Sequence, residues 1–160
     1  MGEARIVAEG LKFPNGLALS ADETKLYCAQ TSAADVLVFD IGPGATLGPG
    51  QRYGPQLGEL MRPGEPAQEP STLGYTDGIG FDVQGNLWVC LPGANRIVAI
   101  TPALKVVSLV HDPSGKIVNH PTNITWGGPD LMDLYIGSIR ADYVLKARSP
   151  VAGQPHIHQR

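Results

Sequence analysis

One pattern of residues occurs three times along the 160-residue chain, and it constrains the fold more than any other feature. Each copy begins with Asn or Asp, continues through a short apolar run and a turn, and ends in Leu, an aromatic residue and a small or β-branched residue. The copies begin at Asn15, Asp77 and Asn123, so the offsets from 15 to 77 and from 77 to 123 are 62 and 46 residues. The second offset is typical of a four-stranded propeller blade, about 40–50 residues.

The repeated segments predict β-strands. β-branched and aromatic residues are enriched between turns of Gly, Asp and Asn, and no segment has a sustained apolar stripe of helical period. We therefore predict an all-β chain, a β-propeller segment of about three blades that is half of a six-bladed ring. Residues 1–160 are expected to form a single partial domain, with blade repeats around 13–60, 75–115 and 120–160.

The longer first offset comes from residues 42–73, which are rich in Gly and Pro. We interpret this insertion as a fourth strand followed by a long surface loop. A domain linker is the alternative interpretation. The copies on both sides repeat each other, which favours one continuous array over two domains.

Three blades do not close a ring, because propellers have about 4 to 8 blades and closure is what protects their sheet edges. The segment Arg5–Ala8 has the character of an outer strand from a preceding blade, which predicts an N-terminal half that this sequence lacks. The rival expectation is that two copies of the chain pair to give six blades. Either arrangement covers two open blade faces, so we expect the isolated chain to associate.

Charge and composition exclude several functions. The 12 Lys and Arg residues and 15 Asp and Glu residues give a net charge of −3 without a block of like charge, which argues against nucleic-acid and membrane-surface partners. No apolar stretch approaches the roughly 20 residues of a membrane span. Cys28 and Cys90 lack zinc-site or disulfide spacing and are expected to be small buried residues. The first residues do not form a signal peptide, so a cytoplasmic location is expected.

Asn15 and Asp77 occupy the same place in successive copies, and a Gly follows each. Equivalent positions in a propeller converge on the central channel, and amide and carboxylate oxygens are hard ligands suited to Ca²⁺ or Mg²⁺. The Gly is expected to allow a tight turn and to leave space beside the ligand. Asn-Gly and Asp-Gly are also common turn dipeptides, so the purely structural interpretation stays open. Asn123 continues the series without a Gly and is a candidate channel or substrate-binding residue.

The other conspicuous side chains are assigned to packing and loops. Aromatic residues at repeat positions are expected to pack between blades and not to stack on a ligand. Two histidines flank an apparent loop and have no nucleophile motif beside them, so they are interpreted as loop residues. These residues are Tyr27, Trp88, Trp126 and Tyr135, and His111 and His120.

The repeated motifs, taken in order, resemble a known family. The segments Phe13–Ser20 and Lys25–Tyr27, then Thr76–Ile79 with Gly85–Val89, are similar to the senescence marker protein, regucalcin and gluconolactonase family. The region from Pro121 to Ile136 resembles the last blades of that family. The resemblance spans nearly the whole chain.

This resemblance implies a divalent cation, usually calcium, held in the channel of a six-bladed propeller by a Glu, an Asn and an Asp. It assigns the Asn to Asn15 and the Asp to Asp77. The Glu would come from a first blade that this sequence lacks, since the surroundings of Glu3 do not match. Ca²⁺ is the expected metal, with Zn²⁺, Mg²⁺ and Mn²⁺ as alternatives.

The activity implied by the resemblance is hydrolysis of a sugar lactone or related lactone. The cation would polarise the ring carbonyl and stabilise the oxyanion, and Asp77 would serve both as metal ligand and as catalytic base or acid. The family's substrate-binding Arg and Asn residues belong to earlier blades. Two alternatives use the same scaffold: a calcium-binding protein without turnover, and a strictosidine-synthase-like propeller.

Overall fold

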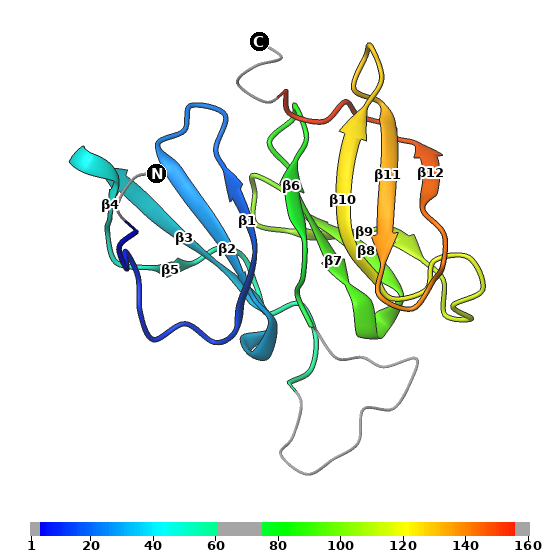
Figure 1. Cartoon of the computed structure of the whole chain (residues 1–160), viewed down its shortest axis with the longest axis horizontal. Helices are drawn as coiled ribbons and strands as arrows, with labels where there is room; N and C mark the ends of the chain where they lie inside the picture. Colours follow the sequence, from blue (N-terminus) through cyan, green and yellow to red (C-terminus); the bar gives the residue numbers. More distant parts are fainter. Residues whose placement is uncertain (1–3, 61–74, 156–160) are drawn as a thin grey trace.

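The computed structural model, which describes residues 4–60 and 75–155, contains three antiparallel β-sheets arranged as successive blades (Figure 1). No α-helix occurs in these two ranges, which confirms the all-β prediction. The first blade contains β1 (Pro14–Leu19), β2 (Lys25–Gln30), β3 (Asp35–Gly42), β4 (Thr46–Leu47) and β5 (Gln51–Arg52). The second contains β6 (Ile79–Phe81), β7 (Leu87–Leu91), β8 (Arg96–Ile100) and β9 (Val106–His111). The third contains β10 (Pro121–Gly127), β11 (Asp133–Ser138) and β12 (Leu145–Arg148).

In the second and third blades, each strand pairs with the next strand along the chain. In the first blade the fourth strand is interrupted, because β4 and β5 are short and both pair with β3. This interruption falls in the Gly- and Pro-rich insertion predicted over residues 42–73. The part of the insertion from 61 to 73 lies outside the described residues.

The first strands of the three blades, β1, β6 and β10, form the inner edge of the array (Figure 1). β6 lies between β1 and β10 and contacts both. This arrangement follows from the repeat, because equivalent strands of successive blades take equivalent positions. It brings the starting residues of the three copies to one end of the inner edge.

Two apolar clusters hold the blades together. Between the first and second blades, the ring of Tyr27 packs edge-on against Phe81 with ring centroids 4.8 Å apart. Between the second and third blades, Trp88 and Trp126 make a similar contact at 5.0 Å. The prediction of interblade packing is therefore confirmed for these residues, whereas Tyr135 is half-buried beneath the Lys146 ammonium on the third blade.

The cysteines and histidines occupy distinct environments. Cys28 and Cys90 are buried free thiols, as expected. His111 is the last residue of β9 rather than a loop residue, and it is exposed. His120 is buried directly before β10, where its backbone N–H donates to Asn95 Oδ1 at 2.8 Å.

The segment from Ser149 to Pro155 runs from β12 across one end of the third blade to the second (Figure 1), and it reaches the first blade through the Gln154 side chain. Gly153 donates its backbone N–H to the Leu131 carbonyl at 2.8 Å, and Gln154 donates its own to the Phe81 carbonyl at 2.9 Å. The Gln154 side-chain amide reaches the Leu19 carbonyl at 3.3 Å. This crossing segment thus fixes the relative positions of the blades.

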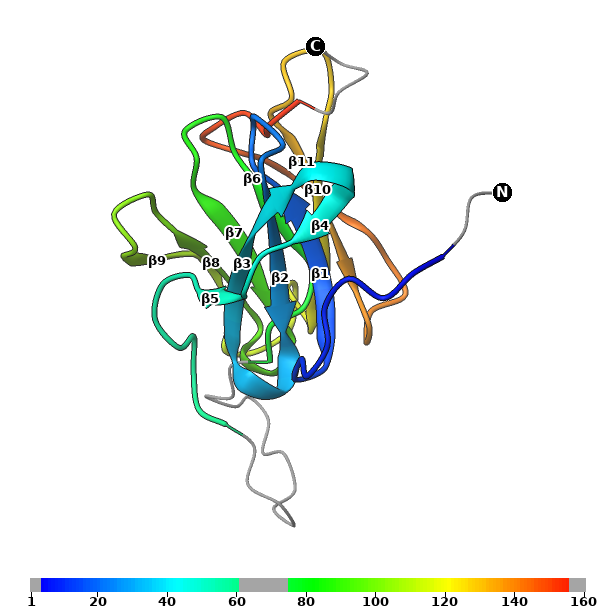
Figure 2. The same ribbon diagram turned by 90° about the vertical axis from the view of Figure 1, so that its left-hand side faces the viewer.

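The N-terminal segment behaves differently from its prediction. Residues 5–8, expected to form an outer strand, form no strand, and the Arg5 side chain donates a hydrogen bond to the Gly44 carbonyl of the first blade. Figure 2 shows this dark-blue segment leaving the base of β1 and running outside the sheets. The described residues also form no helix of the length and apolarity that a membrane crossing requires.

Candidate metal centre

The three residues that begin the sequence repeats lie together at one end of the inner edge. Asn15 belongs to β1, Asn123 to β10, and Asp77 stands two residues before β6. All three line one cavity of about 340 Å³, together with Gly16, Leu17, Gly78, Ile79 and Thr122. The convergence expected from the repeat is therefore present in the fold.

Backbone hydrogen bonds fix this end of the inner strands. The Asp77 N–H donates to the Cys90 carbonyl at 3.0 Å, which attaches the residue to β7 of its own blade. The Gly78 N–H donates to the Thr122 carbonyl at 2.7 Å, which crosses to the third blade. The backbone at Asp77 is thus fixed by hydrogen bonds to the second and third blades, which fixes the position from which its side chain extends.

The glycines that follow Asn15 and Asp77 allow adjacent blades to approach. A Cβ at Gly16 would stand 2.4 Å from the Asp77 carbonyl oxygen, and a Cβ at Gly78 would stand 2.5 Å from Asn123 Oδ1. Neither glycine has positive φ, so the tight turn expected at these positions is not the reason for Gly. The space expected to stay free beside the ligand is instead occupied by the neighbouring blade, which leaves no room for a side chain at either glycine.

The Asn15 side chain is hydrogen-bonded to the turn that follows β2, the second strand of its blade. Its Nδ2 donates to Thr31 Oγ1 at 3.3 Å, and Thr31 Oγ1 donates to the Thr76 carbonyl at 2.7 Å. Asn15 also makes a side-chain hydrogen bond to Asp77. Because an amide nitrogen carries two donors, both bonds can be made while the amide oxygen stays available to a cation.

The ionisation of Asp77 is opposed by its surroundings. Burial raises the pKa of this carboxyl, and the hydrogen bonds from the Asn15 side chain and the Gly78 backbone only partly offset that effect. A half-buried carboxylate without a full counter-charge favours a nearby cation. Asn15 and Asn123 themselves are exposed, because the inner edge is open on the side away from the blades.

The residues present fit a hard cation better than a soft one. The donors that face the cavity are amide and carboxylate oxygens, the ligand types of Ca²⁺ and Mg²⁺. Burial raises the pKa of the Cys90 thiol, and the nearby Asp77 charge raises it further, so a thiolate ligand is disfavoured there. Within residues 4–60 and 75–155, no group of three or more His, Cys, Asp and Glu side chains could hold a metal.

The described side of the site supplies only part of a calcium coordination sphere. Ca²⁺ takes about 6–8 oxygen ligands, whereas Asn15, Asp77 and Asn123 offer one carboxylate and two amides. Asn123 Oδ1 already accepts the Ile124 N–H at 3.0 Å, which leaves it one lone pair. A cation here therefore needs water, substrate or side chains from other blades.

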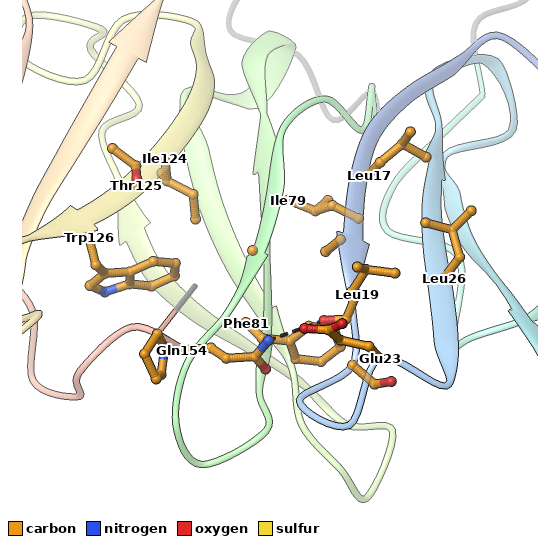
Figure 3. A pocket seen from close by; sticks show the side chains of 14 residues that line it. Leu17, Leu19, Glu23, Leu26, Ile79, Phe81, Ile124, Thr125, Trp126 and Gln154 are labelled. Carbon is orange, nitrogen blue, oxygen red and sulfur yellow. Dashed lines mark hydrogen bonds between the residues drawn. The ribbon is translucent and has the colours of Figure 1, made fainter. Parts of the chain in front are cut away.

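A second cavity of about 430 Å³ continues along the same inner strands (Figure 3). Figure 3 shows leucines of the first blade on one side, Ile124 and Trp126 of the third blade on the other, and Phe81 between them. The Gln154 side chain crosses one end toward the Leu19 backbone. The candidate metal ligands and this apolar cavity thus lie at opposite ends of one inner edge.

Sequence reasoning missed the residues that support the candidate ligands. Thr31 follows β2 and Thr122 precedes Asn123, and neither stands at a position that repeats in all three copies. The sequence did indicate the apolar cavity, because Leu17 and Leu19 follow Asn15 at the two-residue spacing that places side chains on one face of a strand. Ile79 and Phe81 follow Asp77 in the same way.

Comparisons with known proteins agree with this architecture. A family model described as "SMP-30/Gluconolactonase/LRE-like region" matches residues 1–140. Regucalcin of Danio rerio is 31% identical over 142 residues, which cover 87% of this chain and 43% of that protein. Pentonolactonase XacC of Haloferax volcanii is 23% identical and covers 88% of this chain and 43% of its own length.

Solved structures agree on the fold. A regucalcin from Agrobacterium tumefaciens, described as a calcium-binding protein, matches with a TM-score of 0.60 at 18% identity. The match covers 81% of this chain and 39% of that one. The three sheets are therefore consecutive blades of a partial propeller, and the chain spans less than half the length of these relatives.

Proposed function

We propose metal-dependent lactone hydrolysis as the function of this chain, which belongs to the SMP-30/gluconolactonase/LRE-like family. Lactonases and gluconolactonases among its relatives support hydrolysis of sugar lactones at the level of the family. The observation that carries the proposal is the cavity where Asn15 and Asp77 face each other with Asn123 beside them. The proposed substrate is a small lactone, and nucleic acids and membranes are not proposed as partners.

Asn15 and Asp77 would hold the cation, for which we propose Ca²⁺, with Mg²⁺ and Mn²⁺ as alternatives of similar ligand preference. Zn²⁺ fits less well, since the cavity offers no nitrogen or thiolate ligand among the described residues. When bound, such a cation would stabilise the negative charge that develops on the carbonyl oxygen of a lactone.

The chain's own residues would accept a proton from the attacking water and orient the groups that react. Asp77 is the proposed base, which accepts a proton from the attacking water, and its raised pKa brings it nearer the neutral range where base catalysis is efficient. Asn15 orients that carboxylate through their hydrogen bond, and Thr31 orients Asn15. Asn123 is the proposed contact to substrate hydroxyl groups.

Calcium binding without turnover is the second candidate function. It is favoured by the single carboxylate in the described cavity, which leaves one group to serve as both ligand and base. A structural relative described as a calcium-binding protein supports it too. No observation on the described residues favours the strictosidine-synthase-like alternative.

The test combines thermal melting with an acid-release assay. Ca²⁺ is expected to raise the melting temperature of the wild-type chain, and Asp77→Ala and Asn15→Ala should each weaken the Ca²⁺ affinity by at least about tenfold because each removes a ligand. Asp40→Ala is the matched control, since this exposed aspartate pairs with Lys25 on the first blade away from the cavity.

The outcomes separate the two functions. Acid release from a panel of sugar lactones, lost in Asp77→Ala, supports the lactonase. A rise in melting temperature with Ca²⁺, without acid release from any lactone, supports the calcium-binding function. Wild-type calcium affinity in both Asp77→Ala and Asn15→Ala contradicts the metal centre itself.

A further inference from the structure

The three blades differ in their number of strands. The second blade has four strands, and the first has three strands plus the interrupted fourth formed by β4 and β5. The third blade has only β10, β11 and β12, so β12 is an edge strand that pairs with β11 alone among the described residues. Such an edge exposes unpaired backbone donors and acceptors and can add another strand.

The N-terminal segment has the composition of a strand but pairs with no strand among the described residues, and its Arg5 side chain donates a hydrogen bond to the first blade, at the Gly44 carbonyl. Residues 4–9 include adjacent β-branched residues, Ile6 and Val7, whose exposed fractions are 77% and 46%. No residue of this segment pairs with a strand in the described chain. β-branched residues favour extended backbone, so the segment is suited to pairing when an edge is offered.

The order of strands along the chain indicates which edge that is. The fourth strand of the second blade, β9, precedes the first strand of the third blade, and β5 likewise precedes β6. Residues 4–9 precede β1, so they stand where the fourth strand of a preceding blade would be. Among the described residues, a segment in the position of a fourth strand therefore precedes the first blade, and the third blade has three strands.

A single chain does not bring the two together. Figure 1 shows the N-terminal segment beside the first blade and β12 at the far side of the third blade, with the second blade between them. Because residue 14 already begins β1, the segment does not reach β12 of its own chain without dissociation of the blades. Pairing therefore requires another chain.

We propose that two copies of the chain exchange these strands, so that residues 4–9 of each copy pair antiparallel with β12 of the other. The exchange is reciprocal, as twofold symmetry requires, and it gives every blade a fourth strand. It also places the open face of each first blade, where Leu17 is 61% exposed, against the open face of a third blade. The result is a closed ring of six blades.

A closed ring would also complete the metal centre. This expectation rests on the proposed function, whereas the proposed strand exchange is independent of it. Closure brings two sets of Asn15, Asp77 and Asn123 around one axis. The second set supplies the oxygen ligands that one chain lacks. We therefore expect one Ca²⁺ per two chains, and a dimer that binds no Ca²⁺ would contradict the metal centre while leaving the strand exchange intact.

The experiment measures the mass of the intact chain by light scattering and sedimentation over a concentration series. The expected mass is twice the 16.9 kDa of one chain. Val7→Pro should raise the dimer dissociation constant by at least about a hundredfold, because proline removes a backbone donor and two symmetry-related pairings are lost together. Val7→Thr is the matched control and should remain dimeric, since threonine keeps the donor and the β-branch.

Two further measurements keep the proposal testable if Val7→Pro alters folding. An excess of a peptide of residues 4–12 should convert the wild-type dimer to monomer. Oxidation of a mixture of Val7→Cys and Ala147→Cys chains should link the two variants, whereas neither variant alone should form the link. A wild-type chain that stays monomeric, or a dimer that neither Val7→Pro nor the peptide weakens, overturns the proposal.

Discussion

The middle blade and the two flanking blades come from the same repeat but are buried to different extents. In the second strand of each blade, all five residues of β7 are buried, whereas four of six are buried in β2 and two of six in β11. The middle blade packs against one apolar cluster on each face, and each flanking blade contributes to only one. The difference shows that a blade in this chain is built to be covered on both sides.

The same contrast appears in the turns between the first two strands of a blade. In the first blade, Asp22 accepts hydrogen bonds from Ser20 and Thr24 and is exposed. In the middle blade, Asp82 accepts from Asn86 and from Trp88 Nε1 at 2.9 Å and is buried. The covering comes from the crossing segment at 149–155, which pairs with Asp82 through Gly153.

The largest expected effect is a cavity in the middle blade. Leu87→Ala should lower the free energy of unfolding by about 3 kcal/mol, because Leu87 is fully buried and the neighbours cannot fill the space. Leu17→Ala on the open first blade should cost less than about 0.5 kcal/mol in a dilute monomer. Urea unfolding of both variants measures the contrast, and equal losses would show that the flanking face is covered.

The turn aspartates should show a smaller contrast. Asp82→Ala should cost about 2 kcal/mol, because the Trp88 indole and Asn86 donors lose a buried acceptor. Asp22→Ala should lower the free energy of unfolding by less than Asp82→Ala does, because Asp22 is exposed and water can replace it as the acceptor. The Ser20 and Thr24 hydrogen bonds lower the pKa of Asp22 from 3.8 to about 2, so its contribution is present above pH 4 and lost as the pH falls toward 2. The difference in the free energy of unfolding between wild type and Asp22→Ala should be smaller at pH 2.5 than at pH 7.

The blade contacts at the metal centre can be tested with glycines. Gly78→Ala should cost about 1–3 kcal/mol, because its Cβ would stand 2.5 Å from the Thr122 carbonyl oxygen and the blades must separate. Gly137→Ala is the control, since its nearest neighbour would be at 3.9 Å. Thermal unfolding measures both. Similar stabilities of the two variants would contradict the close blade contact.

The smallest expected effect concerns Asp77 in the absence of metal. A raised pKa means that ionisation costs stability as the pH rises through the folded-state value, so Asp77→Asn should be slightly more stable than wild type at pH 7, by less than about 1 kcal/mol. The advantage should vanish below the pKa of the unfolded carboxyl. In saturating Ca²⁺ the order should reverse, and a variant that is less stable without metal would contradict the assigned cause.

The repeat predicted much of this architecture. Strand positions from Asn15 and from Asn123 followed directly from alternating apolar residues between turns, because a blade repeats its local chemistry. The meeting of the starting residues at one end of the inner edge followed from the same periodicity. The reason for Gly16 and Gly78 did not, since blade-to-blade approach depends on atoms far apart in the sequence.

Other features depended on contacts that no repeat encodes. The crossing segment at 149–155 occurs once in the chain, so its role in burying Asp82 had no counterpart to compare. The contact of Thr31 with Asn15 joins two elements of one blade through side chains that differ between copies. The strand expected over residues 5–8 was predicted from their composition alone, and composition does not give the backbone pairing that a strand needs.

The central claim is that Asn15 and Asp77 bind one hard cation at the inner edge of the blades. A crystal structure of the chain grown with Ca²⁺ tests it most directly. The account predicts a cation in the cavity with the Asn15 Oδ1 and an Asp77 carboxylate oxygen each within about 2.3–2.6 Å. Calcium bound elsewhere, with the hydrogen bond between these two side chains unchanged, would contradict it.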